Sequence, residues 1–232
     1  MKLDRVTMTG PNDFTNIADL YSITGEFPYV EWGILVSMRQ EGTSRFPTQK
    51  WIRQIPEGAS GFSMHLCGRW LDDLLIGKIS FPMDLAERFR RMQLNFHGED
   101  IKYDRDAFVH ALARLPIKQF IFQADGNRGS QLLAEVEDGK QSFSCYPLHD
   151  ISHGAGVVPD NWPAPLNTDY EGYAGGLGPK NLAQQLDKIA KVVGDDQRIW
   201  VDMETKVRTD NDRVFDLEKV RECLRIAKPY IK

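Results

Sequence analysis

The sequence predicts one (β/α)8 barrel, or TIM barrel, that uses residues 1–232 as a single domain. Short apolar runs alternate along the chain with longer segments of helical period, which is the pattern of a parallel sheet. There are eight such runs, and a length of 232 residues is close to the ~250 residues typical of this barrel. An open, doubly wound sheet is the alternative, but no GxGxxG motif follows the first run.

The eight apolar runs are the expected strands. Several lack a strict apolar–polar alternation, as expected for strands that are buried on both faces of a parallel sheet. In order, the expected strands are 5–9, 30–37, 61–67, 92–97, 119–124, 141–146, 170–174 and 198–203.

Helix signals follow seven of these strands. Asn12 or Asp13 is expected to cap the first helix and Ser130 the fifth, and Pro179 stands near the start of the helix after the seventh strand. The sixth unit has only a proline-rich segment, 159–165, so its helix is short or missing. The expected helices are 13–22, 48–54, 82–91, 104–115, 130–136, 180–193 and 216–227.

Charge and cysteine content narrow the classes of function. The formal net charge is −4, so no general basic field favours nucleic acid. Cys67, Cys145 and Cys223 are far apart and form no CxxC pair, which argues against disulfides and zinc. The sequence has neither a signal-peptide pattern nor the ~20 apolar residues that span a bilayer. We therefore expect a cytoplasmic protein that binds neither nucleic acid nor membrane.

Several segments, in this order, resemble a known family. They are GTSRFPT at 42–48, LNFHGE at 94–99, LHD at 148–150 followed by GAG and DNW, GYAGGLGPKN at 172–181, and VDMETKVR at 201–208. Together they are similar to phosphoribosylanthranilate isomerase, the barrel enzyme of tryptophan synthesis. The resemblance covers nearly the whole chain, and the ordered set is more specific than any one segment.

The resemblance implies an aldose–ketose isomerase of the Amadori type that acts on a small phosphorylated sugar and needs no cofactor or metal. Asp150 matches the general acid at the end of the sixth strand, and Arg45 matches the arginine that holds the substrate carboxylate. His97 is expected to position the substrate. A phosphate is expected between two loops, on Gly175, Gly176, Thr205 and Lys206. A homodimer is left open.

The first and eighth strands depart from the family. Thr9 stands where the family has the cysteine that acts as general base, and Lys206 stands where it has glycine. A threonine hydroxyl is no base near neutral pH unless a partner activates it. Substitutes for the base are expected at strand ends, where the candidates are His65, His97, Asp125, Asp202 and Glu204.

Two other functions remain open. The missing cysteine supports a non-catalytic relative that binds a phosphorylated ligand or a partner protein. His65 and Cys67 point the same way along one strand, and with carboxylates from other strands they could hold the metal of an aldolase or epimerase. A buried, hydrogen-bonded pair is the plainer interpretation of these two side chains.

Because Thr9 replaces the base, we predict that turnover of phosphoribosylanthranilate is very weak or absent. Loss of a catalytic base typically lowers the rate ~10²–10⁴-fold. Thr9→Cys should raise any trace activity, and Asp150→Asn should abolish it, both measured in a steady-state isomerase assay. A wild-type turnover within tenfold of roughly 10 per second would show that another residue serves as base.

Overall fold

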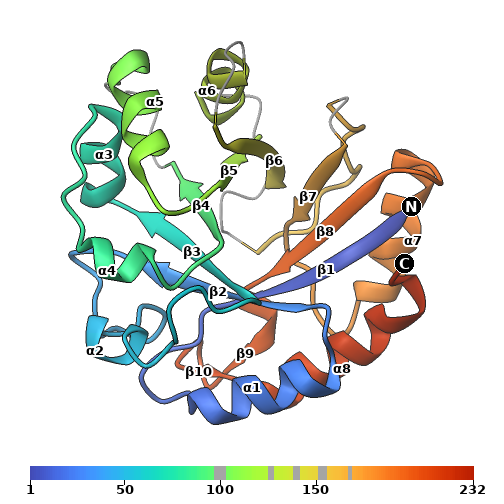
Figure 1. Cartoon of the computed structure of the whole chain (residues 1–232). Helices are drawn as coiled ribbons and strands as arrows, with labels where there is room; N and C mark the ends of the chain where they lie inside the picture. Colours follow the sequence, from blue (N-terminus) through green and yellow to red (C-terminus); the bar gives the residue numbers. More distant parts are fainter. Residues whose placement is uncertain (97–102, 125–127, 138–141, 151–155, 167–168) are drawn as a thin grey trace.

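Eight parallel strands close into a barrel in which β1 pairs with both β2 and β8. The computed structural model describes residues 1–96, 103–124, 128–137, 142–150, 156–166 and 169–232. Figure 1 shows the helices arranged around the outside of the strands. The prediction of a (β/α)8 barrel is confirmed.

Most strands lie where the sequence places them. Two of the expected ranges, 170–174 and 198–203, are those of the observed β7 and β8. The eight barrel strands are β1 Lys2–Thr9, β2 Val30–Val36, β3 Phe62–Cys67, β4 Arg91–Asn95, β5 Gln119–Gln123, β6 Ser144–Asp150, β7 Tyr170–Ala174 and β8 Arg198–Met203.

The expected sixth strand, 141–146, was wrong at its end. Pro147 signals a stop because proline donates no hydrogen bond to a ladder, but β6 continues through it to Asp150. Pro147 pairs with Phe122, and Leu148 after it pairs with Gln123, so the ladder tolerates the missing donor. As a result, Asp150 is the last residue of β6 and lies at the carboxyl edge of the barrel.

The helices that cover the barrel keep their predicted order, with one addition. Asp104 and Asp216 cap α5 and α8 through their side chains, and Thr48 caps α2 in the same way. None of the helices in the described ranges has the length and apolar character needed to cross a membrane. The helices are α1 Ile17–Glu26, α2 Gln49–Ile52, α3 Arg69–Leu75, α4 Met83–Ala86, α5 Arg105–Arg114, α6 Arg128–Glu137, α7 Leu182–Val193 and α8 Leu217–Ala227.

Two expected helix starts were wrong. The first helix begins at Ile17 rather than 13, because Asn12 closes a turn with the backbone of Phe14 and Thr15, and Asn16 then provides the cap. Ser130 lies inside α6 instead of capping it.

Two further helix predictions also need correction. The expected helix 82–91 is only the single turn α4, because Arg91 already begins β4. The helix α3 was not expected, since Gly68 precedes it and no side chain caps it.

The connection after β6 differs from the other units. Its described part, 156–166, contains no helix, as the proline-rich segment predicts. After β8 the chain forms a short 3₁₀ turn, Thr205–Val207, and a hairpin of β9, Arg208–Thr209, and β10, Val214–Phe215. Asp210, Asn211 and Asp212 at its tip all have positive φ, a conformation that costs of order 1–3 kcal/mol per residue.

A buried ion cluster lies within the barrel. Glu31 on β2 accepts from Arg5 at 2.8 Å and from Arg91 at 2.9 Å, and Arg91 is 1% exposed. The Arg91 guanidinium also lies over the Trp200 ring, 4.6 Å from its centroid. These polar groups replace the aliphatic layers common inside such barrels, so their charges must be paired to be tolerated.

We predict that Glu31→Gln destabilises the protein by about 3–5 kcal/mol, because it leaves buried Arg91 without its counter-charge. The free energy of unfolding in urea measures this loss. Glu41→Gln is the matched control: Glu41 is exposed and its carboxylate accepts hydrogen bonds from Gln49 on the surface, so a change within about 0.5 kcal/mol is expected. Equal effects of the two substitutions would contradict a structural role for the buried cluster.

Candidate functional site

A cavity of about 260 Å³ opens at the carboxyl edge of the barrel. Parallel strands that close a barrel bring their carboxyl ends to one rim, which is where the active sites of this fold lie. The strand ends contribute Leu35, Cys67, Asn95, Gln123, Asp150, Ala174, Asp202 and Met203, and the loops contribute Arg45, Phe46, Gly156, Gly175, Gly176, Leu177, Glu204, Thr205 and Lys206, with Gln93 below.

Six of the predicted site residues line this one cavity. They are Arg45, Asp150, Gly175, Gly176, Thr205 and Lys206. Thr9 lies beneath it in contact with Asp202. His97 and Asp125 lie outside the described residues.

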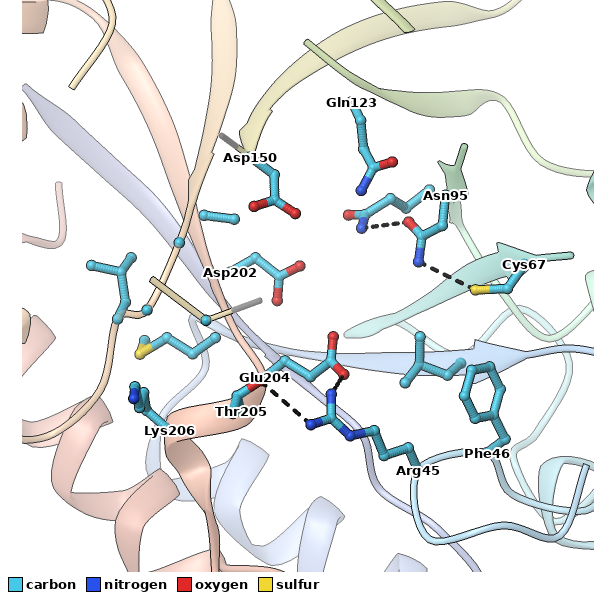
Figure 2. A pocket seen from close by; sticks show the side chains of 18 residues that line it. Arg45, Phe46, Cys67, Asn95, Gln123, Asp150, Asp202, Glu204, Thr205 and Lys206 are labelled. Carbon is cyan, nitrogen blue, oxygen red and sulfur yellow. Dashed lines mark hydrogen bonds and ion pairs between the residues drawn. The ribbon is translucent and has the colours of Figure 1, made fainter. Parts of the chain in front are cut away.

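Asp150 and Asp202 project into the cavity from β6 and β8. Their strands flank β7, and both residues pair in register with Ala174. Neighbouring strands lie ~4.8 Å apart, so the two backbones are roughly 10 Å apart and the side chains converge. Figure 2 shows both carboxyl groups on one side of the cavity, facing the amides of Asn95 and Gln123.

Asp202 is a buried acid. Burial, aided by the negative charges of Glu204, Asp150 and Glu31, raises the pKa of Asp202 to about 8. The Thr9 hydroxyl donates to its Oδ1 at 2.7 Å and works against this rise. Thr9 therefore donates a hydrogen bond to a carboxyl group whose pKa is close to neutral pH.

The opposite wall consists of neutral polar groups. Gln93 donates to Oδ1 of Asn95 at 2.9 Å, and Asn95 donates to Sγ of Cys67 at 3.3 Å. Burial raises the pKa of Cys67 to about 12, so this group is a thiol and not a nucleophilic thiolate. The side-chain amide of Gln123 makes no hydrogen bond within the described part of the chain. This wall offers amides that recognise hydroxyl groups.

Arg45 reaches across the mouth to carboxylates on the far side. Its Nη1 donates to Glu204, its Nε donates to Asp212 at 2.6 Å, and its Nη2 lies 3.5 Å from the Thr205 hydroxyl. The guanidinium predicted to hold a substrate carboxylate is thus paired with two carboxylates of the chain itself.

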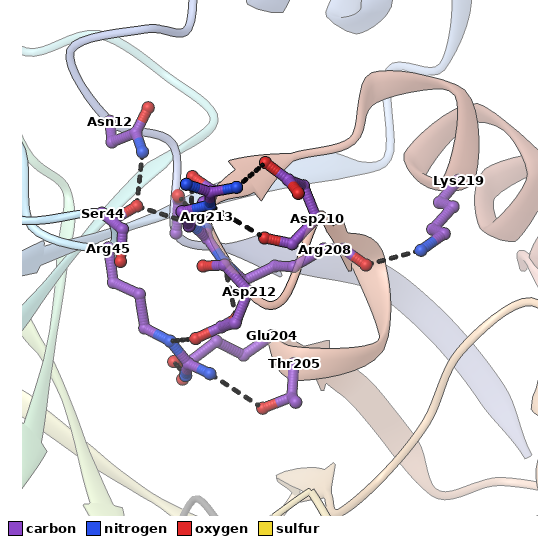
Figure 3. Close-up of polar contacts among 11 residues, drawn as sticks. Asn12, Ser44, Arg45, Glu204, Thr205, Arg208, Asp210, Asp212, Arg213 and Lys219 are labelled. Atoms are coloured by element: carbon purple, nitrogen blue, oxygen red, sulfur yellow. Dashed lines mark hydrogen bonds and ion pairs between the residues drawn. The ribbon is translucent and has the colours of Figure 1, made fainter.

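Arg208 fixes the loops around the mouth (Figure 3). Its side chain is fully buried; Nη1 donates to the carbonyl of Gly10 at 2.7 Å, Nη2 donates to that of Ser44, and Nε pairs with Asp212 at 2.9 Å. A Cβ on Gly10 would lie 2.8 Å from Nη1. One cation therefore joins the loops after β1, β2 and β8 and sets the position of Asp212 against Arg45.

The two loops predicted to bind phosphate meet through a third segment. A Cβ on Gly176 would lie 2.6 Å from the carbonyl oxygen of Gly156, and a Cβ on Gly156 would lie 3.1 Å from Thr205. Within the described chain, nothing accepts a hydrogen bond from the backbone N–H groups of Gly175, Gly176, Thr205 or Lys206. The Lys206 side chain is exposed, so four amides and one ammonium group remain for an anion.

The metal-site alternative finds no support in the described ranges. His65 is buried and does not line the cavity, and no set of three or more His, Cys, Asp or Glu side chains there is arranged to hold a metal. Burial also lowers the pKa of His65 to about 4.

Some residues of the site carried no sequence signal. Gln93 in the middle of β4 and Gln123 at the end of β5 line the cavity, and strand alternation can give their direction but no motif marks them. Asp212 lies in a turn, and its partner Arg45 is 167 residues away in the sequence. Asp202 and Glu204 were found only as candidates for the missing base.

No protein-family profile matches the chain, and no curated protein matches it significantly.

We predict that stability falls as pH rises through about 8, because the folded state holds a proton on Asp202 that the unfolded chain releases near its ordinary pKa of 3.8. This contribution is fully present below pH 4 and is lost by pH 8–9. Asp202→Asn keeps an acceptor for Thr9 but carries no charge, so its free energy of unfolding should not fall in this way. The difference in this free energy between variant and wild type should therefore favour the variant by several kcal/mol more at pH 9 than at pH 4.

Urea unfolding at several pH values measures this difference. Asp196→Asn is the control, since Asp196 is almost fully exposed and its variant should follow the wild-type pH dependence. Parallel stability curves for wild type and Asp202→Asn would contradict a buried, protonated Asp202.

Proposed function

We propose that the protein is an acid–base isomerase that converts a phosphorylated aldose, or an aminoaldose, into the corresponding ketose. The observation that carries this proposal is the pair of carboxyl groups, Asp150 and Asp202, in one cavity at the barrel mouth, with the pKa of Asp202 raised to about 8. The resemblance to phosphoribosylanthranilate isomerase supports the reaction class, and the altered first and eighth strands favour a related substrate.

The two carboxyl groups supply an acid and a base together. Burial, together with the charges of Glu204 and Asp150, disfavours ionisation of Asp202, so the two groups together hold one proton below about pH 8. A singly protonated pair contains one donor and one acceptor. Asp202 lies against Thr9, where the resemblance places the base. We therefore assign the base to Asp202 once its proton has passed to Asp150, and Asp150 then acts as the acid.

The reaction needs only proton transfers. Asp150 protonates the ring oxygen as the sugar opens, and ionised Asp202 removes the proton from C2. The electron pair of that C–H bond forms the C1–C2 double bond of the enediol or enaminol. Proton return to C1 and proton loss from the C2 hydroxyl then give the ketose and restore the pair. No oxidant, metal or cofactor enters the balance.

The ends of the cavity suit the two ends of such a substrate. The amides of Gly175, Gly176, Thr205 and Lys206 and the Lys206 ammonium group would hold the phosphate. Asn95 and Gln123 lie opposite the carboxyl groups (Figure 2), and with Gln93, which donates to Asn95, they would bind sugar hydroxyls. A cavity of about 260 Å³ has room for a pentose phosphate.

Hydrogen exchange tests the proposal without knowledge of the exact substrate. Ribose 5-phosphate, other aldose phosphates and phosphoribosylanthranilate are incubated with the protein in D2O, and loss of the C2 proton and formation of ketose are followed by NMR. We expect exchange with at least one of them and a rate that falls above pH 8, where the pair loses its last proton. Asp150→Asn and Asp202→Asn should each lower the rate ~10²–10⁴-fold.

A phosphate titration of the amide NMR spectrum separates binding from catalysis. Inorganic phosphate at millimolar concentration should shift the amide signals of Gly175, Gly176 and Thr205. Lys206→Gln should weaken phosphate binding, whereas Lys188→Gln, an exposed position of α7, should leave phosphate binding unchanged. Binding without C2 exchange in any sugar would overturn the isomerase and favour the non-catalytic relative. No binding and no exchange would overturn both.

A further inference from the structure

Gly33 leaves a gap in the inner wall of the barrel, and two side chains enter it. A Cβ on Gly33 would lie 2.2 Å from Oγ1 of Thr9, and 2.8 and 2.9 Å from Cε1 and Nε2 of His65. Thr9 pairs in register with Gly33 on one side, and β3 with His65 lies on the other. Both the Thr9 hydroxyl and the His65 imidazole therefore occupy space that only glycine leaves open at position 33.

His65 has a polar atom without a partner. Its Nε2 is fully buried and makes no hydrogen bond within the described chain. Burial, reinforced by the nearby charge of Arg91, holds the imidazole neutral against the opposing effect of Glu31. A neutral imidazole can accept a hydrogen bond at Nε2, and an unfilled acceptor in a buried place is costly. The Thr9 hydroxyl, which enters the same gap at Gly33, donates to Asp202.

We propose that His65 is a positioning residue that acts through Thr9 to stabilise Asp202 in its protonated form. When Asp202 is ionised, the Thr9 hydroxyl donates to it, and Nε2 of His65 has no partner. When Asp202 gains a proton, its own hydroxyl donates to Oγ1 of Thr9, and the Thr9 hydroxyl turns to donate to Nε2. The proton that moves comes from the substrate carbon, and no further reactant is needed.

This chain of hydrogen bonds from Asp202 through Thr9 to His65, here called the relay, makes Asp202 a stronger base. Its role in catalysis rests on the proposed function. Each time Asp202 takes the C2 proton, the unsatisfied imidazole gains a hydrogen bond. The other charged groups that face Asp202 are Asp150 on β6, Glu204 after β8 and Glu31 on β2. Glu31 is itself paired with Arg5 and Arg91, so the relay is the polar contact that responds to the proton on Asp202.

Carboxyl ¹³C NMR of the intact protein, assigned with Asp202→Asn, measures the Asp202 titration directly. His65→Leu should lower the pKa of Asp202 by about one unit, the worth of one hydrogen bond. The opposite shift is expected if Leu only makes the surroundings less polar. His65→Gln retains an acceptor and should restore most of the wild-type value.

Thr9 and Ser63 provide matched variants. Thr9→Ser keeps the relay, whereas Thr9→Val removes it and makes the Asp202 titration insensitive to His65→Leu. Ser63→Ala is the control, because Ser63 also lies on β3 with a buried hydroxyl that has no partner in the described residues, yet the atoms nearest to a Cβ on Gly33 are those of Thr9 and His65 and not of Ser63. This substitution should leave the titration unchanged.

The ¹⁵N signal of His65 Nε2 in wild-type protein needs no variant, so it decides the matter if His65→Leu fails to fold. The chemical shift of this signal should follow the titration of Asp202, because the hydrogen bond from Thr9 to Nε2 forms when Asp202 gains its proton. A signal that stays constant through the Asp202 titration, or a folded His65→Leu protein with an unchanged or raised Asp202 pKa, would overturn the relay. Failure of the isomerase itself shows up separately, as absent C2 exchange with the relay intact.

Discussion

The pairing of β1 with β8 closes the barrel, and the chemistry of the mouth depends on it. This pairing sets Thr7 opposite Asp202 and brings Thr9 within hydrogen-bond distance of a residue 193 positions away. Asp202 is thereby held inside a closed wall, where burial keeps a proton on it. The same closure lets Arg208 reach Gly10 across the seam between β1 and β8. The seam thus positions both the titrating group and the loops around it.

The fold was predictable because its signal is local. Apolar runs separated by helical segments mark each unit, and β7 and β8 were located to the residue. The topology then forces residues such as Arg45, Asp150 and Gly175 to one rim, since all follow strands that run in one direction. Boundaries failed where local chemistry and the wider pattern disagreed: strand pairing carries β6 through Pro147, whereas the Asn12 turn delays the start of α1.

The site was less predictable because its function depends on pairs that are distant in sequence. Strand alternation gives the direction of His65 or Gln93 but says nothing of what lies opposite. Thr9 illustrates the difference. Its identity indicates only that a cysteine is missing, whereas the structure shows which carboxyl group it contacts. The partners of Arg45 lie in loops of unrelated composition and follow from tertiary packing alone.

In the proposed reaction, anion binding and acid–base chemistry are coupled at this mouth. Asp150, Asp202 and Glu204 would together repel a phosphate, and Arg45 is already paired with Glu204 and Asp212. A proton on the aspartate pair removes one negative charge from the cavity, and Arg45 offsets that of Glu204. A bound dianion near Thr205 would in turn disfavour the loss of that proton. The buried proton therefore serves both ends of the proposed reaction: it lowers the repulsion that the ligand meets on entry, and the ligand then keeps the pair in the singly protonated form that holds an acid and a base.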